Sequence, residues 1–110
     1  TLITHLPKPS ARLPVRTEAL WNTFIAGITA HERTHGEIIK ETVDAIRSAT
    51  EGLTVSDDPS CRKIRAEVTK RVAALADEMR RKNREFDQVE MGKDGNVQQL
   101  ILSLVNGDRE

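Results

Sequence analysis

The chain has 110 residues, a length that allows at most one ordinary domain with a modest core. It is 37% hydrophobic and 31% charged but only 3% aromatic, and this composition favours a helix-rich domain over a β-sandwich. The 17 basic residues equal the 17 acidic ones, so the net charge gives no reason to expect nucleic acid as a partner. No apolar run approaches the roughly 20 residues that a membrane span requires.

The first sixteen residues differ in character from the rest of the chain. They hold three of the four prolines, which argue against a helix. Leu2, Ile3 and Leu6 form a short apolar alternation, which predicts an extended segment or an edge strand at residues 1–6. Thr17, placed just before Glu18, is the expected N-cap of the helix that follows.

A long amphipathic helix is predicted from this cap to about Ala49. Its apolar stripe has the three- and four-residue spacing of one helix face: Leu20, Phe24, Ile28, His31, His35, Ile38, Ile39, Thr42 and Ile46. Gly27 and Gly36 lie inside it. Two interpretations are open: one of them allows a close backbone approach, or both are tolerated glycines without a role.

A second helix is predicted from about Ser60 to Val89, with Asp58 as its cap and Pro59 at its first position. The turn-rich stretch 91–96 should end it. Residues 97–105 are short and apolar, which is compatible with a helix or a strand; we favour a short helix and expect the last four residues to fray. The fold class is therefore mostly α, a long antiparallel helix hairpin with a short N-terminal extended segment. Asp77 and Glu78 should lie opposite His31 and His35, because both stretches are about equally far from the connecting loop.

His31 and His35 enclose the sequence H-E-x-x-H within the predicted helix. Residues four apart lie on one helix face, so the two imidazoles can bind one metal ion. Zn²⁺ suits this pair, because it accepts neutral imidazole and in catalytic sites keeps a position open for water. Glu32 is placed to act as the general base on that water. A structural histidine pair is the competing interpretation, and we favour metal binding.

Several features resemble a bacterial domain family of unknown function whose members are described as secreted zinc-dependent proteases. The features run through most of the chain: the lead-in Leu2 to Pro7, Trp21 ten residues before His31, the block His31 to Gly36, Cys61, the pair Phe86-Asp87, and the turn Gly92 to Gln98. The resemblance implies a zincin-like metallopeptidase domain over residues 1–110 that lacks its N-terminal strand region. It also implies a secreted or periplasmic location and a disulfide partner for Cys61 in the missing region. From the sequence alone, Cys61 is equally compatible with a free thiol or a buried apolar residue.

The chain departs from the family pattern after the second helix. Family members have Tyr-Asp-x-x-Thr-x-His-Gly there, whereas this chain has Met91 or Gly92 in place of the histidine. If that histidine is the third metal ligand in relatives, a carboxylate must replace it here. We predict Glu90 as the third ligand; Asp87 and, from the hairpin geometry, Glu78 remain alternatives, and so does a site without a carboxylate ligand.

The predicted function is hydrolysis of peptide bonds in a peptide or protein substrate by a zinc-activated water. The substrate would lie extended along residues 1–6. His5 in that segment would either stabilise the oxyanion or be an exposed residue without a role. Two alternatives remain: a helical interaction module whose H-E-x-x-H motif is catalytically dead, and a structural hairpin with an accidental motif.

Overall fold

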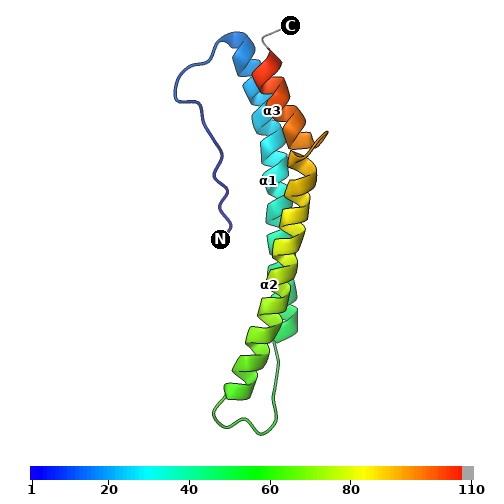
Figure 1. The fold of residues 1–110 in the computed structure, drawn as a ribbon. Coiled ribbons are helices and arrows are strands. Elements are labelled where there is room, and N and C mark those ends of the chain that lie inside the picture. Colours follow the sequence, from blue (N-terminus) through cyan, green and yellow to red (C-terminus); the bar gives the residue numbers. More distant parts are fainter. Residues whose placement is uncertain (108–110) are drawn as a thin grey trace. The chain divides into compact units, whose positions relative to one another are not determined.

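The computed structural model describes residues 1–107 and consists of three helices (Figure 1). They are α1 (Val15–Thr50), α2 (Arg62–Met91) and α3 (Asn96–Asn106). None of the described residues forms a strand, so the prediction of a mostly α chain is confirmed. No helix within the described residues has the length and apolar character needed to cross a membrane. Of the four C-terminal residues expected to fray, 108–110 lie outside the described residues.

Helix α1 begins at Val15, three residues before the Glu18 that a cap at Thr17 would place first. The Glu18 N–H donates to the Pro14 carbonyl at 2.8 Å, so the first turn already includes Thr17. Thr17 is therefore not the N-cap, and this prediction was wrong. The physical reason is that proline's fixed φ is compatible with a helix start, so Pro14 can lead directly into the first turn. At the other end, Gly52 has a φ of 74°, which is the left-handed conformation typical of a residue just after a helix.

The start of α2 keeps the predicted cap but shifts the helix. The Asp58 carboxylate accepts the N–H groups of Lys63 at 3.0 Å and of Ile64 at 2.9 Å. A turn separates this cap from the helix, and within it Cys61 adopts a φ of 61°. Pro59 therefore lies before the helix rather than at its first position. The helix ends at Met91, two residues beyond the predicted Val89.

The described residues divide into two compact units. The first unit comprises residues 1–36 and 85–107, and the second comprises residues 37–84. In the second unit the ends of α1 and α2 that flank the loop run antiparallel, as expected for a helix hairpin (Figure 1). Arg71 of α2 joins the two, because its guanidinium donates to the Ala49 carbonyl of α1 at 2.6 Å. Glu67, one turn earlier on α2, accepts from the same guanidinium at 3.0 Å.

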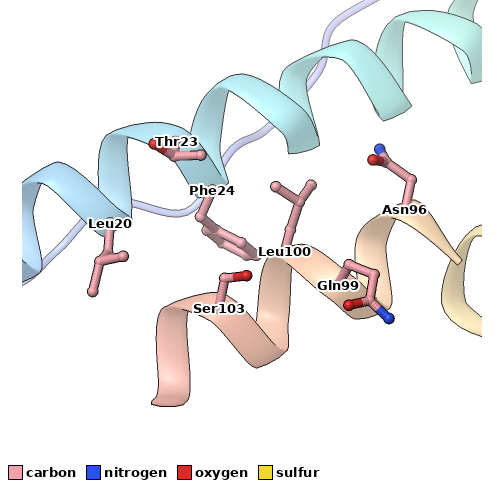
Figure 2. A pocket seen from close by; sticks show the side chains of 7 residues that line it. All are labelled: Leu20, Thr23, Phe24, Asn96, Gln99, Leu100 and Ser103. Atoms are coloured by element: carbon pink, nitrogen blue, oxygen red, sulfur yellow. The ribbon is translucent and has the colours of Figure 1, made fainter. Parts of the chain in front are cut away.

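In the first unit α3 packs against the start of α1. Figure 2 shows Leu20 and Phe24 of α1 on the side that faces Leu100 and Ser103 of α3. These side chains line a cavity of about 160 Å³. A Cβ at Gly27 would collide with the Leu100 side chain, so Gly27 is the glycine that permits close approach. Val97 of α3 is only 2% exposed, and it is the one apolar side chain among the described residues that is classed as buried. This packing covers the α1 face that leads to His31.

The N-terminal segment 1–6 runs without strand pairing, and Leu2, Ile3 and Leu6 are exposed. A strand needs a hydrogen-bonded neighbour, and no other described segment provides one. The edge-strand alternative is therefore not observed. Leu2 nevertheless lies against α1, because a Cβ at Gly36 would be 3.1 Å from Leu2 Cδ2.

We expect Asp58→Ala to lower the free energy of unfolding by about 0.5–2 kcal/mol, because two N–H groups at the start of α2 lose their acceptor. Asp58→Asn should lose less, since its amide keeps one acceptor oxygen. Urea denaturation followed by circular dichroism at 222 nm measures both. Asp44→Ala removes an exposed carboxylate from α1 and serves as the control. A midpoint for Asp58→Ala equal to that of the control would contradict the capping role.

Candidate metal centre

Two helix segments of the first unit supply the residues of the candidate site. His31 and His35 lie one turn apart on α1, and Asp87 and Glu90 lie three residues apart near the end of α2. Both spacings place side chains on one helix face. Each helix therefore contributes two polar groups to the same contact.

Three nitrogen and oxygen atoms converge in this contact. His31 Nε2 lies 3.0 Å from Asp87 Oδ1, His35 Nε2 lies 2.6 Å from the same oxygen, and the two Nε2 atoms are 3.2 Å apart. These are the side chains that the described residues bring together as a possible cation site. The ligands of a tetrahedral zinc ion, each about 2.0–2.1 Å from the metal, are about 3.3 Å apart. The observed edges of 2.6, 3.0 and 3.2 Å are all shorter than this, the His35–Asp87 edge most of all, so the three side chains would have to move apart to bind a zinc ion.

Glu90 lies on the other side of the His31 ring. Its Oε1 is 3.3 Å from His31 Nδ1, so each nitrogen of this imidazole faces a different carboxylate. A neutral imidazole has one N–H and one lone pair. If His31 donates from Nδ1 to Glu90, its Nε2 lone pair points at Asp87 and His35. The Nε2–H of His35 can donate into this space in the metal-free protein, and a cation bound by the same three atoms would take the place of that proton.

The three side chains of the candidate centre differ in their exposure to solvent. The His31 side chain is only 2% exposed and that of His35 is 17% exposed, whereas the Asp87 side chain is 44% exposed. Phe86 stacks on the His31 ring with a centroid distance of 4.7 Å, and it meets His35 edge-on at 5.1 Å. The phenyl ring thus shields both imidazoles, and water can approach past Asp87.

The remaining predicted residues occupy different positions. Glu32 follows His31 on α1, is half-buried, and makes no hydrogen bond or ion pair with any other described residue. Glu78 belongs to the second unit, where Arg81 Nε donates to its carboxylate at 3.1 Å. This hydrogen bond from Arg81 lowers the pKa of the exposed Glu78 below its usual value. His5 is exposed, and Cys61 is an exposed free thiol.

The structure thus brings Asp87 and Glu90, but not Glu78, to the histidine pair. The sequence-based ranking placed Glu90 first as the ligand, whereas the structure places Asp87 at the point where the two Nε2 atoms meet and Glu90 behind His31. The spacing Asp87-x-x-Glu90 was a usable signal, because two carboxylates three residues apart share a helix face. It indicates a pair of carboxylates but not their order around the imidazole.

Comparison with known proteins identifies a family but no function. A family model described as "Bacterial protein of unknown function (DUF922)" matches residues 1–95, a range that includes both histidines and both carboxylates. No curated protein and no solved structure matches the chain. The predicted resemblance is confirmed at the level of a bacterial family of unknown function, and the match carries no information on zinc or proteolysis.

In metal-free protein we expect His31→Ala to lower the free energy of unfolding by about 1–3 kcal/mol, because it removes a buried ring that contacts two carboxylates and Phe86. His35→Ala should cost less, since His35 is more exposed. Urea denaturation in the presence of EDTA, followed by the fluorescence of Trp21 in the same unit, measures both. Equal losses for the two variants would contradict the central position of His31.

Proposed function

The chain belongs to the bacterial DUF922 family, whose function is unknown, and we propose from the site itself that it is a zinc-dependent peptidase with a zincin-like site. The single observation that carries the proposal is the convergence of His31 Nε2, His35 Nε2 and Asp87 Oδ1. Two imidazoles and one carboxylate are the protein ligands of several hydrolytic zinc sites, which leave a further position for water or substrate.

In this proposal His31, His35 and Asp87 bind the ion. When bound, Zn²⁺ lowers the pKa of water and polarises the scissile carbonyl. Asp87 is preferred to Glu90 as the third ligand, because its oxygen lies within 3.0 Å of both Nε2 atoms while Glu90 contacts only Nδ1. The proposal includes a secreted or periplasmic location.

Glu32 is the proposed general base. It lies one residue after His31, so it projects about 100° further round α1 and is not one of the converging ligands. Its carboxylate has no partner among the described residues and is therefore available to a water molecule. Glu32 takes a proton from the attacking water, the water oxygen bonds to the carbonyl carbon, and the proton passes to the amine nitrogen as the C–N bond breaks.

Residues 1–6 are the proposed binding edge for the substrate peptide. The segment is exposed and has no strand partner among the described residues, so its backbone N–H and C=O groups are free to pair with an extended peptide. Leu2 lies against Gly36, the residue after His35, and the segment therefore passes close to the candidate centre. A peptide paired with this segment would have its backbone beside the imidazoles.

The test of the metal site compares substitutions at its members and outside it. His31→Ala, His35→Ala and Asp87→Ala should each weaken zinc binding by more than the roughly 10–100-fold typical of an outer hydrogen-bond partner. Glu78→Ala should bind zinc like the parent, because this carboxylate pairs with Arg81 in the second unit. Competition with a chromophoric chelator measures the affinities, and elemental analysis of protein purified without a His tag identifies the metal. Iron in place of zinc, or stoichiometric zinc in the double histidine variant, would refute the proposal.

The test of catalysis is Glu32→Gln, which keeps the size of the side chain but removes its basicity. We expect this variant to retain zinc and to lose peptide hydrolysis by at least about 100-fold in kcat, the scale of general base catalysis. Glu37→Gln, an exposed glutamate further along α1, is the control and should keep full activity. If Glu32→Gln lost the metal, Glu32 would be a ligand rather than a base. A parent protein that binds zinc but cleaves no peptide would support the catalytically dead interaction module instead.

A further inference from the structure

The carboxylate behind His31 has a distinct role in the candidate centre. We infer that Glu90 is a positioning residue that accepts the Nδ1–H of His31 and thereby presents Nε2 to the metal. The inference rests on the proposed function, because it assigns Glu90 a task in preparing that same site.

The geometry separates Glu90 from the ligand positions. Its Oε1 lies 3.3 Å from His31 Nδ1, whereas Asp87 Oδ1 lies 3.0 Å from Nε2 of the same ring. The lone-pair directions of the two ring nitrogens diverge widely, so an oxygen aligned with Nδ1 cannot also bind an ion held by Nε2. Glu90 also lies outside the group of side chains whose donor atoms converge.

The low exposure of Glu90 and His31 limits the partners that are available to His31 Nδ1. The Glu90 side chain is 16% exposed and the His31 side chain only 2%, so water offers little alternative partner to Nδ1. Phe86, stacked on the ring, prevents His31 from turning freely. Asp87 Oδ1 lies 3.0 Å from His31 Nε2 but only 2.6 Å from His35 Nε2, so the Nε2–H of His35 is the closer donor to this oxygen. Glu90 is then the acceptor left for His31, and it favours the tautomer with the proton on Nδ1.

The charge of Glu90 adds to this orientation. A carboxylate that accepts the N–H of a metal-binding histidine fixes its tautomer and raises its basicity as a ligand, and loss of such a partner costs about 10–100-fold in metal affinity. Asp87 and Glu90 then have complementary tasks on one helix face. Asp87 contacts the ion, and Glu90 orients the imidazole that contacts it.

The experiment compares Glu90→Ala and Glu90→Gln with Glu85→Gln, which removes an exposed carboxylate from the same helix end. Zinc affinity is measured by chelator competition, and long-range ¹H–¹⁵N NMR assigns the His31 tautomer. In the parent we expect the proton on Nδ1. Glu90→Ala should lose the slowly exchanging Nδ1–H signal and bind zinc about 10–100-fold more weakly. Glu90→Gln retains an acceptor oxygen, so it should keep the signal and recover much of the affinity, and Glu85→Gln should match the parent.

Two results would overturn the inference. Parental affinity and an unchanged Nδ1–H signal in Glu90→Ala would remove any role for Glu90. Loss of all zinc in Glu90→Gln, with retention in Asp87→Ala, would make Glu90 a ligand. Failure of the proposed function is seen separately: the parent would then bind no zinc, while the loss of the Nδ1–H signal in metal-free Glu90→Ala would still report the hydrogen bond.

Discussion

The buried imidazole of His31 is the interaction on which the first unit depends. It links α1 to the end of α2 through Asp87 on one nitrogen and Glu90 on the other, and Phe86 covers its face. Among the described residues, His31 is the one polar residue classed as buried, and Val97 is the one apolar side chain classed as buried. Burial of a polar ring is unfavourable unless both nitrogens find partners, so the two carboxylates are a requirement of the fold as much as of any chemistry.

The residues that stabilise the first unit around His31 are also those of the proposed metal site. A hydrophobic residue at position 31 would satisfy the apolar stripe of α1 without needing Asp87 or Glu90. The chain instead places an ionisable group at a buried position, and it surrounds this group with two carboxylates and a second histidine. A cation held by His31, His35 and Asp87 would neutralise facing lone pairs that a neutral imidazole leaves unbalanced. Metal binding would then contribute directly to the stability of the first unit.

The packing of α3 on α1 supports the same face of α1 one turn earlier. Gly27 admits the Leu100 side chain against the helix backbone, and Leu20 and Phe24 continue the contact. Gly27 and His31 lie four residues apart, so the contact with α3 and the contact with the carboxylates share one stripe. α3 thereby covers α1 one turn before His31, while the Asp87 side chain beside His31 is 44% exposed.

The sequence by itself determined the elements that depend on local pattern. The three- and four-residue spacing predicted the long helices, the H-E-x-x-H spacing placed both imidazoles on one face of α1, and Asp58 was recognisable as a cap. Each of these follows from the geometry of a single helix and its first turn.

The tertiary structure alone decided which carboxylates meet the histidines. Asp77, Glu78, Asp87 and Glu90 all lie on one charged helix, and their spacing from the loop did not fix which of them would face the histidine pair. Asp87 rather than Glu90 meets Nε2 because the ring of His31 is oriented by Phe86 and by contacts from a segment more than fifty residues away. The absence of a strand at residues 1–6 also depends on tertiary contacts, because an alternating apolar segment becomes a strand only when another segment pairs with it.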